Sequence, residues 1–168
     1  MSHHNKTYVI FDSENDTWAC DRIHRYNGDW HISFEFTDSR DLKAMAGQRQ
    51  NFQRIQQSLT ERIGQCCEFI VLVGENTRYL YRFERWELDI ALSLGLAGIV
   101  VNLNKKRKVD QDLCPPILRY KNALHIPFER KVIEHALETW PGRFRHSINK
   151  CVGEDWTYNK DTFKRLGV

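Results

Sequence analysis

The sequence predicts an α/β fold built on a five-stranded, mainly parallel sheet, and three observations support this prediction. Short apolar runs alternate with segments of helical periodicity, a rhythm that is typical of parallel strands joined by crossover helices. The runs 69–73 and 98–103 are almost continuously apolar, as central strands buried on both faces are. The length of 168 residues suits one domain with a core of ordinary size.

Five segments have the composition of strands: residues 8–11, 32–36, 69–73, 98–103 and 124–128. The second segment alternates polar and apolar residues, which indicates an edge strand with one face in solvent. The fifth contains Pro127, which cannot donate a backbone hydrogen bond and therefore also favours an edge. The strands are expected in the flavodoxin-like order 2-1-3-4-5, at the centre of a three-layer sandwich.

Four segments have helical character: residues 15–26, 48–65, 82–94 and 130–140. The second places its apolar residues on one face, namely Phe52, Ile55, Leu59 and Ile63. Gly95 is expected to close the third helix, and Pro141 with Gly142 the fourth. Residues 104–122, which contain Cys114-Pro115-Pro116, are expected to form a loop in place of a further regular helix.

The expected domain organisation has three parts. Residues 1–6 are polar and are expected to form a flexible N-terminus, followed by the folded domain over 7–141. Residues 142–168 are mixed and aromatic, and we expect this extension to pack on the domain or on a partner subunit.

Composition excludes several classes of function. A net charge of +3 is too small to indicate nucleic acid, and the basic run 105–108 is interpreted as a solvated loop. The sequence has no apolar run of membrane-spanning length and no apolar signal segment, which predicts a cytoplasmic protein. The five cysteines lack a CxxC pair and are expected to be buried free thiols. The histidines do not cluster in the sequence, so no metal site is predicted.

Polar loops are expected to converge where the strand order reverses, which is where open parallel sheets bind ligands. The loops are residues 12–16 after the first strand, 74–78 after the third and 37–41 after the second. No GxGxxG, GxxxxGK[ST] or GxSxG motif accompanies them, which argues against dinucleotide-binding Rossmann, P-loop and nucleophile-elbow chemistry. The third strand ends without the acid, and the fifth without the lysine, that a receiver domain requires.

Glu87 is the strongest candidate for a working residue. A helical projection of the segment 82–94 places it within an apolar stripe, together with Leu80, Phe83, Ile90, Ala91 and Leu94. Arg82, Arg85, Asp89 and Ser93 fall on the opposite face. A carboxylate that points inward without a partner is costly, so Glu87 is either catalytic or ion-paired with an arginine such as Arg40 or Arg78.

Three segments resemble the TIR-like domain of the Thoeris anti-phage ThsB family: Phe69-Ile-Val-Leu-Val-Gly-Glu-Asn-Thr, Phe83-Glu-Arg-Trp-Glu-Leu-Asp-Ile-Ala-Leu and Ile99-Val-Val-Asn-Leu. The resemblance extends over residues 8–140, and the loop 114–119 is similar to some members. Enzymatic TIR domains carry a glutamate four residues after an aromatic residue on the matching helix, a spacing that Phe83 and Glu87 reproduce. The first strand departs from the pattern, because Asp12 precedes Ser13.

The resemblance implies a flavodoxin-like fold and a hydrolase that uses Glu87 to cleave NAD at the nicotinamide–ribose bond. NAD would be a substrate and not a permanently bound cofactor. The ADP-ribose part would become a signal, expected to be cyclic, for a separate effector protein in antiviral defence. A phage-derived trigger and a homo-oligomer are further expectations. Two alternatives stay open: a TIR-like scaffold without activity, and a nucleoside deoxyribosyltransferase-like enzyme.

The other candidate residues each have a structural alternative. Asp12 and Ser13 either bind ligand or cap the first helix, and Asn76 either binds ligand or stabilises a turn. Asp38 and Arg40 either order their loop or, through Arg40, bind phosphate. Two aromatic residues could stack on the ligand or belong to the core, Phe83 and Trp86.

Overall fold

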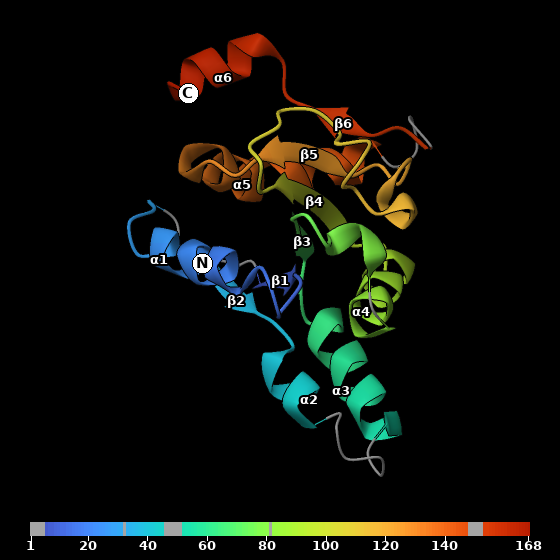
Figure 1. Cartoon of the computed structure of the whole chain (residues 1–168). Helices are drawn as coiled ribbons and strands as arrows, with labels where there is room; N and C mark the ends of the chain where they lie inside the picture. The colour runs from blue at the N-terminus through green and yellow to red at the C-terminus, as the bar shows by residue number, and fades with distance from the viewer. Residues whose placement is uncertain (1–5, 32, 46–51, 81, 148–152) are drawn as a thin grey trace.

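The computed structural model describes residues 6–31, 33–45, 52–80, 82–147 and 153–168. Its centre is a six-stranded sheet with the order β2-β1-β3-β4-β5-β6, in which every neighbouring pair is parallel (Figure 1). The strands are β1 (Lys6–Ile10), β2 (Glu35–Thr37), β3 (Glu68–Val73), β4 (Ala97–Asn102), β5 (Leu124–Pro127) and β6 (Trp156–Thr157). The predicted flavodoxin-like order is confirmed for the first five strands, and β6 extends it by one.

Helices cover both faces of the sheet, as Figure 1 shows. The elements of the first face are α1 (Thr17–Asn27), α5 (Arg130–Ser147) and α6 (Lys160–Leu166), and those of the second are α2 (Arg40–Met45), α3 (Phe52–Gly64) and α4 (Arg82–Ser93). Successive strand residues point to opposite faces, so Val9 packs with α1 and α5 while Tyr8 packs with α3 and α4. All residues of β3 and β4 are buried, as their apolar sequences predict.

The predicted edge position of β5 is only partly correct. β6 pairs with Leu124 and His125 of β5, so the edge of the sheet passes to β6 over these two positions. Pro127 pairs with Asn102 of β4 and lies beyond the residues that β6 covers. The missing N–H of Pro127 therefore leaves no gap in the ladder between β5 and β6.

The prediction that Pro141 and Gly142 end the fourth helix is wrong. Helix α5 continues through Pro141 to Ser147, because its buried face continues on both sides of the proline, with Trp140 and Phe144 in the core. A proline in a helix removes one backbone hydrogen bond, and the burial of these aromatic side chains offsets that loss.

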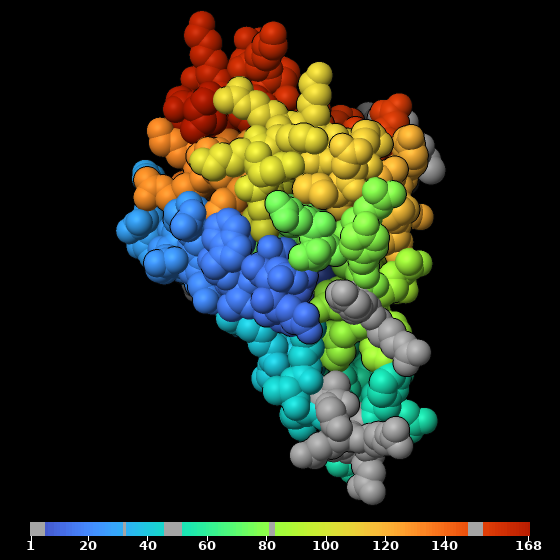
Figure 2. All heavy atoms as spheres, in the orientation of Figure 1, coloured from blue at the N-terminus to red at the C-terminus, as the bar shows by residue number. Residues whose placement is uncertain are grey.

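The extension after α5 returns to the sheet. The short β6 leads to α6, whose first turn is capped by the side chain of Asn159, which accepts a 2.9 Å bond from the backbone N–H of Thr162. Tyr158 and Phe163 join the core cluster on the α1–α5 face. Figure 2 shows this segment at the end of the molecule opposite α2 and α3.

Other boundaries differ by a few residues. Helix α1 begins at Thr17 and not at residue 15, since residues 12–16 form a turn around the Asp12 side chain. The segment after β2, expected as a loop, contains α2. Residues 104–122 lack a regular α-helix, as predicted, and include the 3-10 turn Pro116–Leu118.

Some expectations fall partly or wholly outside the described residues, namely the flexible N-terminus over 1–5, strand residue 32, helix residues 48–51 and Cys151. Of the other cysteines, Cys20, Cys66 and Cys114 are buried free thiols as predicted, whereas Cys67 is exposed. None of the helices within the described ranges combines the length and apolarity needed to cross a bilayer.

Candidate functional site

A cavity of about 350 Å³ lies at the carboxyl ends of the central strands. Asn15, Asp16 and Trp18 contribute from the β1 side, and the segment 74–76 contributes after β3. The predicted loops after the first and third strands therefore meet. The loop after β4 adds Leu103, Asn104 and Leu113, which the sequence analysis did not single out. Figure 2 shows the blue, green and yellow segments that carry these loops side by side on the visible face.

Asp16 is the most constrained acid of this cavity. The residue is 7% exposed, and its Oδ2 lies 3.5 Å from the Thr77 hydroxyl, which also accepts a bond from the backbone N–H of Gly74. A Cβ atom at Gly74 would lie 2.4 Å from Asp16 Oδ2, so only glycine leaves room for the carboxylate. Burial, together with the negative charge of Asp12, raises the pKa of Asp16 to about 6.

Asp12 and Ser13 organise the turn that leads to Asp16. The Asp12 carboxylate accepts bonds from the backbone N–H of Glu14 and from the backbone and side chain of Asn15. The Ser13 carbonyl accepts a 2.8 Å bond from the hydroxyl of Thr17. The N-cap residue of α1 is Asp16, so the interpretation of Asp12 or Ser13 as the helix cap is wrong. Both residues instead form hydrogen bonds within the turn that precedes the helix. Neither lines the cavity.

Asn76 does line the cavity. It precedes the 3-10 turn Thr77–Tyr79, and its side chain makes no capping hydrogen bond to that turn. The exposed amide is therefore available to a ligand, in contrast to the side chain of Thr77, which is used within the protein.

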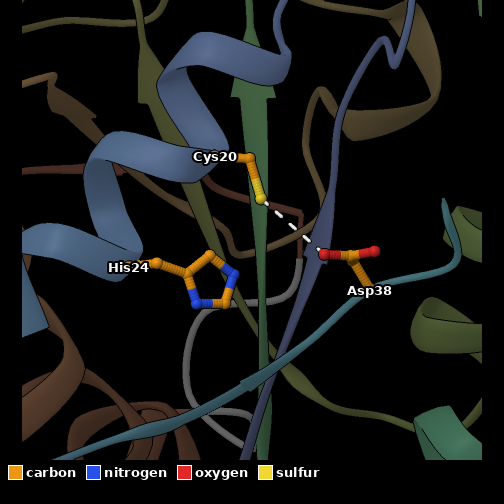
Figure 3. Close-up of side chains that lie close together, drawn as sticks. All are labelled: Cys20, His24 and Asp38. Atoms are coloured by element: carbon orange, nitrogen blue, oxygen red, sulfur yellow. Dashed lines mark hydrogen bonds between the residues drawn. The ribbon is translucent and has the colours of Figure 1, made fainter.

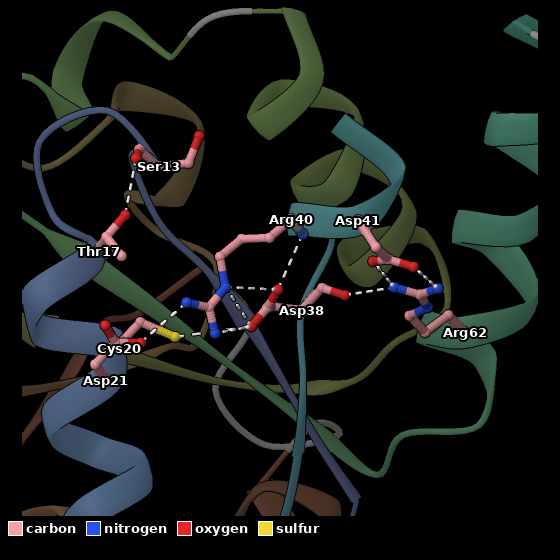
Figure 4. A network of polar contacts seen from close by, with 8 residues as sticks. All are labelled: Ser13, Thr17, Cys20, Asp21, Asp38, Arg40, Asp41 and Arg62. Atoms are coloured by element: carbon pink, nitrogen blue, oxygen red, sulfur yellow. Dashed lines mark hydrogen bonds and ion pairs between the residues drawn. The ribbon is translucent and has the colours of Figure 1, made fainter. Parts of the chain in front are cut away.

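The third predicted loop does not reach this cavity. Arg40 wraps around Asp38 with bonds of 3.0–3.2 Å to both carboxylate oxygens and also pairs with Asp21 at 2.9 Å (Figure 4). Arg62 from α3 anchors the same loop through the Asp38 carbonyl and the Asp41 carboxylate. The hydrogen bonds that the Arg40 guanidinium donates to the Asp38 carboxylate raise the pKa of Arg40 above its usual value. In this arrangement Arg40 orders its loop, and its guanidinium is not free to receive a phosphate.

One group of potential metal ligands lies beside this network. Figure 3 shows Cys20 and His24 on α1 facing Asp38, with one ligand atom of each within 4.8 Å of the others. The sequence analysis missed it because Asp38 is distant in the chain, although the i, i+4 spacing of Cys20 and His24 is a usable signal. Arg40 already neutralises Asp38, and burial raises the pKa of the Cys20 thiol to about 12. Both effects oppose the binding of a cation.

Glu87 lies on the other face of the sheet, where α4 packs on β1. The residue is 1% exposed, and Oε1 accepts a 2.7 Å bond from the hydroxyl of Tyr8. Oε2 is buried and has no hydrogen-bond partner among the described residues. Burial raises the pKa of Glu87 to about 7, while Lys43, Ser39 and Tyr8 act in the opposite direction. The expected partner for an ion pair was an arginine, but Arg40 pairs with Asp38 and Arg78 bonds to the Asp112 carbonyl.

The inward face of α4 differs in detail from the projected stripe. Leu88 and Ala91 are fully buried, and Glu84 is 8% exposed, whereas Leu94 is 45% exposed and does not belong to the stripe. Helix α4 thus presents two inward carboxylates, Glu84 and Glu87, one turn apart. Arg85, Asp89 and Ser93 are exposed as predicted.

Lys43 of α2 is the cation of this cluster. Its Nζ lies 2.5 Å from Glu84 Oε1 and is placed over the rings of Phe11 and Phe83, 5.8 and 5.4 Å from their centres. Phe83 therefore packs against the lysine, and Trp86 packs edge-to-face against Phe52 of α3 at 4.6 Å. Both aromatic residues are occupied by contacts within the protein.

The chain's polar candidates thus form two groups. Asp16, Glu75 and Asn76 border the open cavity, and Tyr8, Lys43 and Glu87 form a closed cluster under α2. The sheet separates the two faces on which Glu87 and α1 lie.

Comparisons with known proteins give one family match. The family model described as "Thoeris protein ThsB, TIR-like domain" matches residues 1–108, more than half of the chain. No curated protein matches. Among solved structures, the chain is similar to the Clostridium botulinum CMP N-glycosidase BcmB, with 12% identity over 80% of this chain and 98% of that one, at a TM-score of 0.49. A likeness of that degree carries no argument about activity.

Proposed function

Because this chain belongs to the Thoeris ThsB family of TIR-like domains, we propose that it is an anti-phage enzyme that cleaves NAD at the nicotinamide–ribose bond. Glu87 is the catalytic residue of this proposal. The observation that supports it is a buried carboxylate whose pKa is raised to about 7 and whose Oε2 has no hydrogen-bond partner within the described ranges. A group with such a pKa is present in both protonation states at neutral pH, which suits a residue that handles charge or protons.

The chemistry fits a carboxylate of this kind. Departure of nicotinamide leaves positive charge on the ribose, and a nearby carboxylate in a poorly solvated site stabilises that charge. The bond from Tyr8 fixes one oxygen of Glu87 and leaves Oε2 for the ribose. Cleavage transfers the bonding electron pair to nicotinamide, and water or a second nucleophile of the same substrate then takes its place on the ribose.

Access to Glu87 requires movement. A carboxylate that is 1% exposed does not touch a dinucleotide, and the segment that includes Ser39 and Lys43 lies over it. That segment is held by the ion pairs Lys43–Glu84 and Arg62–Asp41. The proposal therefore includes a displacement of α2 before NAD reaches Glu87, which assembly of several copies or a phage-derived trigger would drive.

The product in this proposal is an ADP-ribose derivative, cyclic where a second nucleophile of the substrate replaces water. It acts as a signal for a separate effector protein. NAD is consumed as a substrate and is not retained as a cofactor.

The test measures nicotinamide release from NAD by the wild type and by Glu87→Gln. Loss of the carboxylate should lower the rate at least about 100-fold, the scale expected for a group that acts on transition-state charge. Addition of lysate from phage-infected cells supplies a trigger if the isolated protein is inactive. Equal rates for a folded Glu87→Gln protein would refute the assignment. The same assay with free nucleosides as substrates tests the alternative reaction, because a deoxyribosyltransferase-like enzyme would cleave these and not NAD.

The second candidate function is a scaffold without activity, and the closed surroundings of Glu87 favour it. Two apolar side chains near α2 are half exposed, Met45 at 51% and Phe52 at 50%, as in a surface that contacts another copy. Light scattering together with NAD titration separates the two functions. A protein that assembles, but neither binds NAD nor releases nicotinamide with the trigger present, is a scaffold.

A further inference from the structure

The basic run at residues 105–108 has neighbours that the sequence does not reveal. It lies in the loop after β4, next to α6 and the start of α5. The Arg107 guanidinium lies over the ring of Phe163 of α6, 4.4 Å from its centre, and Lys105 pairs with Glu129 just before α5. Figure 2 shows the yellow loop and the red α6 side by side at one end of the molecule. Three segments that are distant in the sequence therefore form one surface.

Positive charge is concentrated on this surface. The segments 105–108, 129–131 and 160–166 contain nine of the 25 lysines and arginines of the chain and only two of its 22 acids. The rest of the chain has more acids than bases, so the net charge of +3 conceals a strongly basic end. All nine cations are exposed. They define what we call the basic surface: Lys105, Lys106, Arg107, Lys108, Arg130, Lys131, Lys160, Lys164 and Arg165.

Most of these cations are not neutralised within the protein. Lys105, Lys106 and Arg130 form ion pairs with carboxylates. The other six have no ion-pair partner among the described residues: Arg107, Lys108, Lys131, Lys160, Lys164 and Arg165. A Cβ atom at Gly167 would lie 3.4 Å from the Lys131 Nζ, which places this lysine beside the end of α6. Like charges gathered on one surface repel each other, and a polyanion relieves that repulsion.

The loop that carries the basic run is held from within. Asn102 is 1% exposed, and its side-chain amide donates 2.9 Å bonds to the carbonyls of Lys106 and Lys108. The buried Asp110 carboxylate accepts a 2.7 Å bond from the side chain of Asn104 and pairs with Lys106 at 3.1 Å. The backbone is therefore fixed before any partner arrives, and binding orders only the ends of exposed side chains.

The composition of the basic surface favours one class of polyanion. Large exposed apolar side chains in the described part of the chain all lie elsewhere, namely Trp18, Met45, Phe52, Tyr79, Leu94 and Tyr120. The surface thus lacks the aromatic anchors of protein interfaces and the rings that stack on single-stranded bases. It also lacks the apolar side chains that enter a membrane surface. Lysine and arginine alone suit the phosphates of a duplex, which they bind whatever the base sequence.

We propose that the basic surface binds the phosphate backbone of duplex nucleic acid, without preference for sequence. Side chains of the loop after β4, of the start of α5 and of α6 contact successive phosphates. A cavity of about 290 Å³ lies within this surface, bordered by Lys105 and Arg107. Glu129 also borders it but is already paired with Lys105. This binding goes beyond the cleavage of NAD, and the basic surface shares no residue with the cluster around Glu87.

The experiment measures fluorescence anisotropy of a labelled DNA duplex of about 20 base pairs with the whole protein. At 50 mM salt the wild type should bind with a Kd on the order of 10 µM or below. If about four phosphates are contacted, the logarithm of the affinity should fall against the logarithm of the salt concentration with a slope of about −3.6. This slope corresponds to roughly 100-fold weaker binding at 200 mM. A second duplex of unrelated sequence should bind within about twofold, and the single strand more weakly.

Two double variants with matched loss of charge assign the surface. Lys108→Gln/Arg165→Gln should weaken duplex binding about tenfold at 50 mM salt and make the slope shallower by about 2, because two phosphate contacts are lost. The control Lys121→Gln/Arg54→Gln also removes one lysine and one arginine, both exposed and both outside the basic surface. Its affinity should stay within about twofold of the wild type, with the same slope. Circular dichroism checks that both variants fold.

Three results would overturn the proposal: no duplex binding at about 100 µM protein in 50 mM salt, a slope near zero, or equal losses in the two double variants. Tighter binding to polyglutamate, or to phosphatidylcholine vesicles with about 30% phosphatidylserine, would also overturn it, because the surface would then serve an acidic protein or a membrane. NAD takes no part in this assay, so its outcome does not depend on whether Glu87 is catalytic.

Discussion

Glu87 and Glu68 are both buried glutamates whose Oε2 accepts no hydrogen bond from the part of the chain that the structure describes, but they lie in different surroundings. Glu68 begins β3, and its single bond comes from the hydroxyl of Thr7 at 3.0 Å. Burial raises its pKa to about 8, against the bond from Thr7, which acts in the opposite direction. Glu87 is equally buried, but Lys43, Ser39 and Tyr8 hold its pKa at about 7. Burial alone therefore keeps an acid neutral, and polar neighbours return it to the range where it exchanges protons at neutral pH.

The comparison predicts that the same substitution affects activity strongly at Glu87 and hardly at Glu68. Glu87→Gln should reduce nicotinamide release at least about 100-fold, because the carboxylate is proposed to act on the ribose. Glu68→Gln should leave the rate within about twofold, since the hydrogen bond of Glu68 comes from Thr7 at the start of the sheet and does not involve Glu87. Release is measured by chromatography on proteins with matched circular dichroism. A comparable loss in both variants would show that the effect of Glu87→Gln is structural.

Removal of the Lys43 charge should lower the stability of the protein, because the inward carboxylates of α4 then lack a cation. Lys43→Met leaves the buried Glu84 without its partner and should destabilise the protein by about 3 kcal/mol in urea unfolding. The pKa of Glu87 should also rise, because the attraction of Lys43 lowers it. The double variant Lys43→Met/Glu84→Gln should recover most of the stability. Arg85→Met, which breaks a half-exposed pair with Asp89 on the same helix, should cost less than about 0.5 kcal/mol.

Glu68→Gln should stabilise the protein in a pH-dependent way. The folded pKa of about 8 lies above the ordinary value of 4.5, so the wild type loses stability as the pH rises between these values. The variant lacks this loss. Its advantage should be near zero at pH 4, grow through neutral pH and level off above pH 8 at on the order of 1–3 kcal/mol. A constant difference between pH 4 and pH 9 in urea unfolding would contradict the origin of the effect in ionisation.

Tyr8→Phe should have the smallest effect. Loss of the 2.7 Å bond to Glu87 removes a donor to the ionised carboxylate and raises the pKa of Glu87. If the ionised form is active, the acidic limb of the pH–rate profile should move to higher pH by about half a unit, with little change at pH 9. A uniform loss of rate at every pH would assign the hydroxyl to contact with substrate and not to the ionisation of Glu87.

The fold was predictable because apolar runs and helical periodicity are local signals. The order of five strands followed from the alternation of the two, and the buried β3 and β4 from continuous apolar residues. The two-residue β6 has no such signal, since its place beside β5 depends on packing of Trp156 and Phe163 against distant residues. The predicted helix end at Pro141 was wrong for a related reason, because burial of Phe144 outweighed the local helix-breaking tendency of proline.

The site was predictable in part. The inward direction of Glu87 came from helical periodicity, and the meeting of the loops after β1 and β3 from strand order. The neighbours of Glu87 could not be predicted from the sequence. Lys43 reaches Glu84 because of the position of α2, a segment that was expected to be a loop. Separation of the cavity from Glu87 likewise depends on which face of the sheet each loop follows.

The absence of a side chain at Gly74 makes the cavity sensitive to a small increase in volume at this position. A single methyl group at this position would take the space of the Asp16 carboxylate while leaving the strand and the acid itself in the chain. Gly74→Ala would displace the charge of Asp16, whereas Asp16→Asn would delete the charge and keep the shape of the side chain. Among related chains, positions 16 and 74 should covary, and an acid at the first should accompany glycine at the second.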